Sequence, residues 1–276
     1  MSQSPHLRPA ADEALAHASS LGNVYLLSCS FNQDSSCFVC GTTAGLRVYT
    51  AEPVCEVQRR EGGAFRGRSV ICATMLQTTN IFALVTGSRE NPTSSASRVQ
   101  IWDDHQGKFI HELRPESEVK GIDMRRDTVA VVCEHSIQVY TCGSWELMLY
   151  LTTHTNPRGL CTLATGDTWM MCCPGLSSGS VRVQTGLEQN ATHVFKAHKT
   201  PLVALALNAS GSLVATASES GTTAQVFQTA DGQVLYTMRM GPPRVCGPTL
   251  VSGIVFRPDD RFLAVASQSE VRLFKL

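Results

Sequence analysis

The chain has 276 residues, 43% of them apolar, and its 23 Lys and Arg residues balance 23 Asp and Glu residues. A chain of this size can bury a large core as one all-β domain. Its neutral charge excludes a global field that would draw it to nucleic acid or to an anionic bilayer, so any anion site must be local. No segment approaches about 18 continuous apolar residues, and no secretory or transit signal is present, so a soluble, intracellular protein without a nucleic-acid partner is expected.

Short apolar strands separated by turn residues recur along the chain. The first unit has predicted strands at residues 26–31, 37–41 and 46–49. Weaker copies in the middle of the chain are recognised by alternating strands at residues 99–102, 137–140 and 181–184. The clearest copies have strands at residues 203–207, 213–218, 224–227, 251–256, 262–267 and 271–274. Turn residues between short apolar runs are typical of antiparallel strands.

The repeat length of about 40 residues is the period expected for four-stranded β-propeller blades. We therefore expect an all-β propeller of WD40-like blades with six recognisable units, at residues 24–62, 66–114, 118–154, 158–195, 199–240 and 250–276. Residues 1–20 are predicted to be a disordered tail and residues 21–276 the propeller domain.

The eleven cysteines are odd in number and scattered, which favours reduced thiols over a disulfide framework. Cys37 and Cys40 form a CxxC pair, but both lie in a predicted strand. Positions i and i+3 of a strand face opposite sides, so this pair cannot readily share a metal or a disulfide. The adjacent pair Cys172 and Cys173 is likewise interpreted as strand packing.

Enzyme classes with recognisable motifs are excluded. The sequence has no GxSxG, Walker A, HExxH or glycine-rich dinucleotide motif, and its eight histidines show no metal-ligand spacing. We therefore expect no catalytic residue, no metal and no cofactor, and a binding or scaffolding function.

Several short segments, in order along most of residues 24–276, resemble landmarks of the PROPPINs, the phosphoinositide-binding β-propellers of autophagy. These segments are Phe31-Asn32-Gln33-Asp34, Ile101-Trp102-Asp103-Asp104, Ser117-Glu118-Val119-Lys120, Asn156-Pro157-Arg158-Gly159 and Ala215-Thr216-Ala217-Ser218-Glu219. Met238-Arg239-Met240-Gly241 stands where the family carries Phe/Leu-Arg-Arg-Gly. The pattern is closest to the shorter branch of the family.

The resemblance implies a seven-bladed disc with two rim pockets for phosphatidylinositol 3-phosphate or 3,5-bisphosphate, one on each side of the Arg-Arg pair. A guanidinium fork suits a phosphate because it meets two oxygens at once. Carried over by position, the first pocket consists of His198, Ser218, Thr222 and Arg239. An arginine of the family's pocket is Gln225 here.

The second pocket departs further from the family pattern. Met240 replaces its arginine, its threonine is missing, and Ser267 and Arg272 are the residues left, next to the unfavourable charge of Glu270. We therefore expect weakened phosphoinositide binding through one pocket. Restoring the arginine by Met240→Arg should strengthen binding only modestly.

The resemblance also implies an exposed rim contact at Asn32 and Asp34 for the rod-shaped lipid-transfer protein of autophagosome growth. An adaptor of this kind would be cytoplasmic and peripheral on autophagosomal precursor or endosomal membranes. It would recruit autophagy machinery to phosphatidylinositol 3-phosphate.

The residues of the predicted first pocket can also have purely structural roles. Arg239 can be an ordinary exposed strand-end arginine, His198 a histidine that packs within its blade, and Ser218 and Thr222 turn residues. The protein would then be a scaffold propeller that has lost lipid binding. The implied seventh blade is absent from the sequence, which leaves a six-bladed closure, an incomplete isoform or gene model, and completion by a partner, with an incomplete or diverged member favoured.

Overall fold

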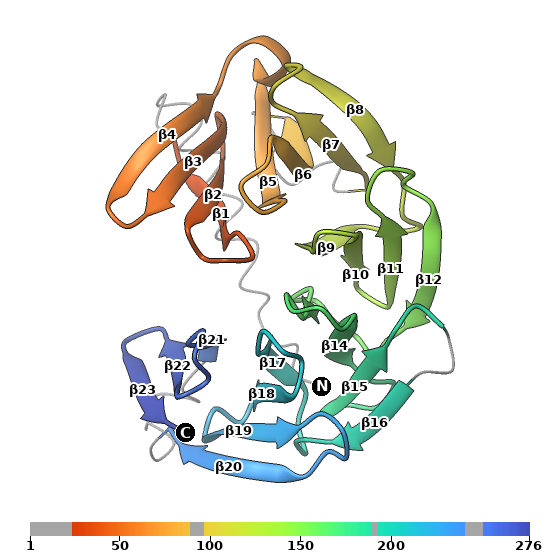
Figure 1. Cartoon of the computed structure of the whole chain (residues 1–276), viewed down its shortest axis with the longest axis vertical. Coiled ribbons are helices and arrows are strands. Elements are labelled where there is room, and N and C mark those ends of the chain that lie inside the picture. The colour runs from red at the N-terminus through yellow and green to blue at the C-terminus, as the bar shows by residue number, and fades with distance from the viewer. Residues whose placement is uncertain (1–23, 89–96, 189–191, 241–250) are drawn as a thin grey trace, which may run out of the picture. The chain divides into compact units, whose positions relative to one another are not determined.

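Antiparallel sheets account for nearly all regular structure in the described part of the protein. The computed structural model describes residues 24–88, 97–188, 192–240 and 251–276. Within these ranges five sheets have four strands and one has three, and the one helical segment is the 3-10 turn Gly63–Phe65. Each sheet is a meander of strands consecutive in sequence, the arrangement of a propeller blade (Figure 1). The all-β prediction and its six units are confirmed.

Contacts along the chain divide it into two compact units, the first ending at Val119 and the second beginning at Lys120. The first unit holds two sheets. Blade 1 contains β1 (Leu26–Phe31), β2 (Cys37–Thr42), β3 (Gly45–Ala51) and β4 (Val54–Arg60). Blade 2 contains β5 (Arg68–Met75), β6 (Ile81–Ser88), β7 (Val99–Asp103) and β8 (Lys108–Leu113).

The second unit holds four sheets. Blade 3 contains β9 (Val119–Met124), β10 (Thr128–Cys133), β11 (Ser136–Thr141) and β12 (Leu147–Thr152). Blade 4 contains β13 (Thr162–Leu163), β14 (Met170–Pro174), β15 (Ser180–Thr185) and β16 (Thr192–Lys196). Blade 5 contains β17 (Leu202–Leu207), β18 (Leu213–Ser218), β19 (Thr223–Gln228) and β20 (Val234–Arg239). Blade 6 contains β21 (Val251–Phe256), β22 (Phe262–Ser267) and β23 (Val271–Lys275).

The core lies between consecutive blades of each unit. In the second unit, β17 packs against β13 and β14 on one side and against β21 on the other. Successive strand residues face opposite sides, so blade 4, between blades 3 and 5, contributes side chains to two cores. Cys173 packs into the core between blades 3 and 4, and Cys172 into the core between blades 4 and 5. Their predicted role as strand packing is therefore confirmed.

The thiols of blade 1 follow the same alternation. Cys37 packs against the core that blades 1 and 2 share, whereas Cys40 lies on the other face, with its Sγ atom 3.9 Å from Sγ of Cys29. The ten described cysteines are all free. The prediction that Cys37 and Cys40 lie in one strand and face opposite sides of it is confirmed.

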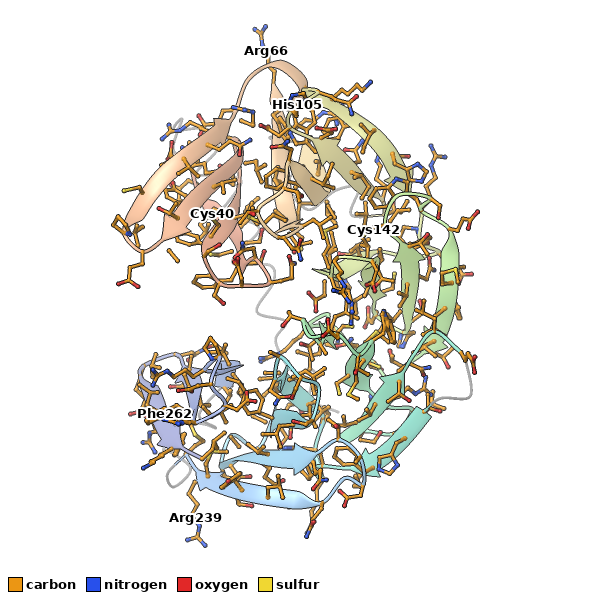
Figure 2. All side chains as sticks on the ribbon, in the orientation of Figure 1. Cys40, Arg66, His105, Cys142, Arg239 and Phe262 are labelled. Carbon is orange, nitrogen blue, oxygen red and sulfur yellow. The ribbon has the colours of Figure 1, made fainter. Side chains whose placement is uncertain are left out.

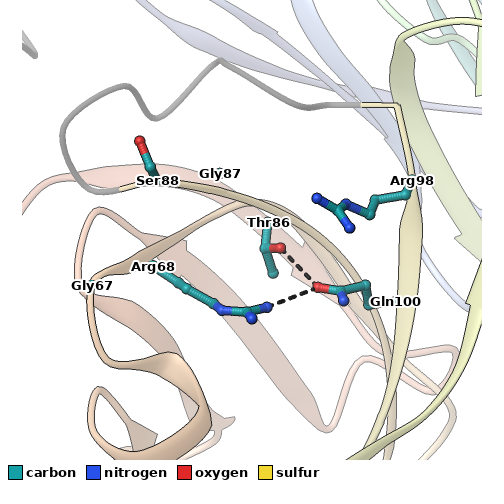
Figure 3. Close-up of a pocket in the computed structure, with 7 residues that line it drawn as sticks. All are labelled: Gly67, Arg68, Thr86, Gly87, Ser88, Arg98 and Gln100. Carbon is teal, nitrogen blue, oxygen red and sulfur yellow. Dashed lines mark hydrogen bonds between the residues drawn. The ribbon is translucent and has the colours of Figure 1, made fainter.

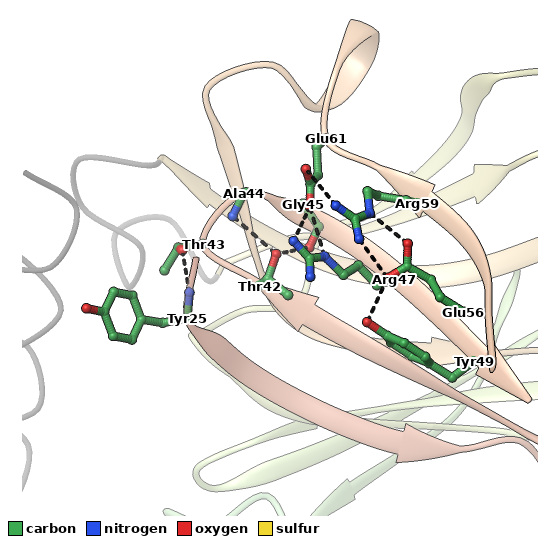
Figure 4. A network of polar contacts seen from close by, with 10 residues as sticks. All are labelled: Tyr25, Thr42, Thr43, Ala44, Gly45, Arg47, Tyr49, Glu56, Arg59 and Glu61. Atoms are coloured by element: carbon green, nitrogen blue, oxygen red, sulfur yellow. Dashed lines mark hydrogen bonds and ion pairs between the residues drawn. The ribbon is translucent and has the colours of Figure 1, made fainter. Parts of the chain in front are cut away.

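The outer strands of blade 1 carry a self-contained network of charges (Figure 4). Arg47 Nη2 lies 2.6 Å from Glu61 Oε1, and Arg59 Nε donates to Glu56 Oε1 at 2.7 Å. Tyr49 donates to the other oxygen of Glu56 at 2.9 Å. Exposed pairs of this kind contribute little to stability. They place a carboxylate beside each of these two arginines and so compensate its charge locally.

Candidate functional site

The outer strands of blade 5 meet at the end of the sheet that the sequence singled out. Strand β18 ends at Ser218, β19 begins beside Thr222, and β20 ends at Arg239. The backbone of Thr223 pairs with Arg239, and the N–H of Met240 donates to the carbonyl of Thr222 at 2.9 Å. The register of β19 and β20 therefore brings Thr222 and Arg239 to the same edge.

Hydroxyl groups line the turn between β18 and β19. Ser218 Oγ lies 3.0 Å from Ser220 Oγ, which lies 3.4 Å from Thr222 Oγ1. The N–H of Gly221 donates to the carbonyl of Ser218 at 2.9 Å, and Gly221 has a φ of 64°. Because Ser218 is buried, its hydroxyl serves the turn. Thr222 is half-buried and retains access to solvent.

His198 is built into the interior of the blade. Its Nε2 atom lies 2.8 Å from Thr216 Oγ1, and burial lowers its pKa although the contact with Thr216 opposes the shift. The carbonyl of Gly179 accepts the N–H of His198 at 2.9 Å, and a Cβ at Gly179 would lie 2.3 Å from the carbonyl oxygen of His198. A neutral imidazole held in this way has the packing role that the alternative interpretation gives it.

Arg239 is the exposed cation of this edge. Its side chain points away from blade 5 (Figure 2), and within the described residues it has no acidic or hydrogen-bonded partner. Since a guanidinium offers five donors in a planar fork, Arg239 is free to meet an anion. Of the four residues of the predicted first pocket, Arg239 is thus exposed, Thr222 is half-buried, and His198 and Ser218 are buried.

The residues predicted for the second pocket are largely satisfied within blade 6. Arg272 Nη2 lies 2.8 Å from Glu270 Oε1, and its Nη1 donates to the carbonyl of Arg239 at 3.5 Å. Ser267 Oγ donates to the carbonyl of Glu270 at 3.2 Å and accepts the N–H of the same residue at 3.3 Å. Arg272 lies beside Arg239, but its charge is compensated by Glu270.

Met240 is a core residue. It is 2% exposed and belongs to the cluster that blades 5 and 6 share. The position that carries an arginine in the family signature therefore faces the interior in this chain.

The prediction that Asn32 lies exposed on a rim loop is wrong. Asn32 is 3% exposed, its Nδ2 group donates to the carbonyl of Gln77 at 3.2 Å, and its Oδ1 atom accepts the N–H of Cys37 at 3.1 Å. Its amide therefore fastens the turn after β1 to blade 2. Asp34 is exposed as predicted, and hydrogen bonds from the hydroxyl and the N–H of Ser36 lower its pKa.

The sequence analysis missed a polar pocket on blade 2 (Figure 3). Its volume is about 260 Å³, and it is lined by Gly67, Arg68, Thr86, Gly87, Ser88, Arg98 and Gln100. Arg68 and Arg98 stand thirty positions apart in the chain, and strand pairing alone brings them together. The signal in the sequence was an arginine at each of two strand starts.

Within the described ranges, no helix is long and apolar enough to cross a bilayer, and no three His, Cys, Asp or Glu side chains are placed to hold a metal ion. The predicted tail at residues 1–20 lies outside the described residues, and so does Gly241 of the signature.

Comparison with known proteins identifies relatives. The family model of the PROPPINs matches residues 26–276. Autophagy-related protein 18e of Arabidopsis thaliana is 33% identical over 220 residues, covering 79% of this chain and 58% of the relative. Autophagy-related protein 18 of Mycosarcoma maydis is 33% identical over 276 residues, covering 91% of this chain and 59% of the relative. The chain spans about three fifths of the length of these curated relatives.

The fold has solved counterparts. The crystal structure of Hsv2 of Kluyvelomyces marxianus matches with a TM-score of 0.78 at 24% identity, covering 92% of this chain and 77% of that one. At this identity the likeness supports the propeller fold alone.

Proposed function

Because the chain belongs to the PROPPIN family, we propose that it is a peripheral membrane adaptor of autophagy that binds phosphatidylinositol 3-phosphate through Arg239. The observation that carries the proposal is the exposed guanidinium of Arg239, which has no acidic partner in the described part of the chain and lies at the same end of blade 5 as the half-buried Thr222. A phosphomonoester brings up to about two negative charges, which suits such a donor pair. Phosphatidylinositol 3,5-bisphosphate is the second lipid of this proposal.

The proposed binding is weak for physical reasons. His198 and Ser218 are buried and hydrogen-bonded within the blade, so they support the turn and leave the headgroup to Arg239 and Thr222. The neighbouring Arg272 is paired with Glu270. Loss of a second arginine in the signature removes the avidity that two pockets give on one membrane.

The same observations favour a second candidate, a scaffold propeller without lipid binding. In that case Arg239 is a solvated strand-end arginine. Under either proposal the exposed carboxylate of Asp34 remains a candidate contact for an autophagy lipid-transfer protein, and the site of action is the cytoplasmic face of autophagosomal precursor or endosomal membranes.

Liposome flotation separates the two candidates. Phosphatidylcholine vesicles containing phosphatidylinositol 3-phosphate are floated with the wild type, Arg239→Ala and the control Arg261→Ala, which removes an exposed arginine from the turn between β21 and β22. Hydrogen bonds to charged groups contribute about 1.5–3 kcal/mol, so Arg239→Ala should weaken binding roughly tenfold or more.

Added salt should weaken the binding of wild type and control alike. Equal flotation of wild type and Arg239→Ala would exclude the lipid-adaptor proposal and favour the scaffold.

A further inference from the structure

Blade 2 carries at one edge a counterpart of the Arg239 edge of blade 5, and the strand registers show the correspondence. In blade 5 the pairing of β17 with β18 shifts directly after Leu202 pairs with Ser218. In blade 2 the pairing of β5 with β6 shifts directly after Val70 pairs with Thr86. Aligning these two irregularities places Thr86 at the position of Ser218.

The outer strands extend the correspondence. The residue two before Ser218 pairs with Gln225 of β19, and the residue two before Thr86 pairs with Gln100 of β7. Gln225 and Gln100 pair in turn with residues of the outermost strands, β20 and β8. Counting two residues onward along those strands gives Arg239 in blade 5 and Arg114 in blade 2. Arginine therefore occupies the same strand-end position in both blades.

Blade 2 has further arginines at this edge. Arg68 and Arg98 line the pocket of about 260 Å³, and Arg98 and Arg114 line a second cavity directly beside it, which Glu112 also lines. Figure 3 shows Arg68 and Arg98 entering the pocket from different strands, with Thr86 and Gln100 between them. The pocket lies entirely within the first unit.

Buried polar groups form the floor of this pocket. Thr86 and Gln100 are 6% and 8% exposed. The Oε1 atom of Gln100 accepts the hydroxyl of Thr86 at 2.8 Å and Nη1 of Arg68 at 3.3 Å. The guanidinium of Arg68 also lies over the ring of Phe109, 5.4 Å from its centre. Arg68 is thus held in one orientation, with donors left over for a ligand.

The pocket keeps a positive charge. Glu112 lies 3.6 Å from Arg98 and 2.8 Å from Arg114. Burial opposes its ionisation, but the bonds from Arg114 and the charge of Arg98 hold its pKa below the usual range. It therefore remains a single anion shared between two arginines. Arg68 has no acidic partner within the described residues.

We propose that this pocket of blade 2 is a phosphate-binding site, in which Arg68 and Arg98 donate hydrogen bonds to one phosphomonoester group from two sides. A tetrahedral group with three terminal oxygens can accept from two guanidinium groups at once, whereas the two coplanar oxygens of a carboxylate suit one guanidinium fork. The volume lies just below the range of about 300–1,000 Å³ typical of small-molecule pockets, which suits a phosphorylated headgroup or a small soluble phosphate compound.

The test uses the full chain with Arg239→Ala, which removes the phosphate contact proposed for blade 5. This protein is titrated calorimetrically with inorganic phosphate and with inositol 1,3-bisphosphate at constant ionic strength. We expect saturable binding that Arg68→Gln or Arg98→Gln weakens at least tenfold. The matched control is Arg66→Gln, since Arg66 is exposed and projects from the same edge without lining the pocket.

A vesicle arm distinguishes the sources of the phosphate. If phosphatidylcholine vesicles with phosphatidylinositol 3-phosphate float the Arg239→Ala protein and Arg68→Gln abolishes this, the ligand is a lipid headgroup. If the soluble compounds bind and these vesicles do not, the ligand is a soluble phosphate.

Three results would overturn the proposal: no saturable phosphate binding, equal weakening by Arg66→Gln, or binding of an acidic peptide without binding of phosphate. Unchanged thermal melting of Arg98→Gln, measured alongside, separates lost binding from lost folding.

Discussion

Replacing Met240 by arginine tests the most consequential departure from the family signature. Met240 is 2% exposed and packs with Val251, Leu263 and Val265 between blades 5 and 6. The sequence alone predicts that Met240→Arg restores part of a lipid pocket. The burial of Met240 predicts the opposite, because the guanidinium would enter an apolar core.

The magnitude follows from two contributions. Fully burying a methionine side chain stabilises a protein by about 1.5–3 kcal/mol, and that contribution is lost. An unpaired buried charge adds a penalty of several kcal/mol, reduced where the long arginine side chain can reach solvent. A net destabilisation of about 3 kcal/mol or more is therefore expected. At roughly 2–4 °C per kcal/mol for a chain of this size, the midpoint of thermal unfolding should fall by about 6–12 °C.

Thermal unfolding followed by circular dichroism measures this effect, with Met240→Leu as the control. A change from methionine to leucine nearly conserves volume and should cost less than about 1.5 kcal/mol. If Met240→Arg melts with the wild type and floats more strongly with phosphatidylinositol 3-phosphate vesicles, the side chain faces solvent and the burial argument fails.

Three further predictions concern stability, partner binding and pH. Asn32→Ala removes the amide that joins two blades and should destabilise the protein by about 1–3 kcal/mol. Asp34→Ala should leave the melting temperature unchanged and abolish co-precipitation of the lipid-transfer partner. Equal melting of both variants would contradict the prediction for Asn32, and retained co-precipitation would contradict the prediction for Asp34. Burial raises the pKa of Asp123 to about 6, although the N–H groups of Leu163 and Met124 oppose the shift. The folded state therefore binds the proton of Asp123 more tightly than the unfolded state does. The stabilisation that comes from this protonation is fully present below a pH of about 4 and is lost as the pH rises through about 6. The free energy of unfolding should fall by at most about 3 kcal/mol over this range. Urea unfolding of wild type and Asp123→Asn across this range should show the decline in the wild type alone, and parallel curves would refute the assignment.

The strands of this protein were predictable because local pattern determines them. Residues 26–31, 213–218, 251–256 and 262–267 were placed to the residue, since each is an apolar run between turn residues. The inward direction of Met240 was also contained in the sequence. Met238, Arg239 and Met240 alternate in polarity, and alternation in a strand sends Arg239 out and both methionines in. The comparison with the family signature instead emphasised the arginine that Met240 replaces.

What could not be predicted depends on contacts between distant residues. The amide of Asn32 is typical of a turn, but its bond to Gln77 crosses forty-five positions and buries it. Gln100 looks like any polar residue of a strand until β6 and β7 place it beside Thr86. Sequence spacing gives the alternation along one strand, whereas side chains that meet across a sheet depend on the register between strands.

The neutral net charge is compatible with anion binding at both edges. Charges separated by more than a Debye length, about 8 Å at physiological ionic strength, are largely screened when exposed, so distant acids do not cancel a local arginine. Whether an arginine at a blade edge has an uncompensated charge depends on whether an acidic side chain lies within contact distance. Glu270 compensates Arg272 in blade 6 and Glu112 compensates part of the charge in blade 2, while Arg239 and Arg68 have no acid in contact among the described residues. Arg239 and Arg68 lie at equivalent ends of two blades in separate units, and the neutral net charge of the chain is compatible with the phosphate sites proposed for them.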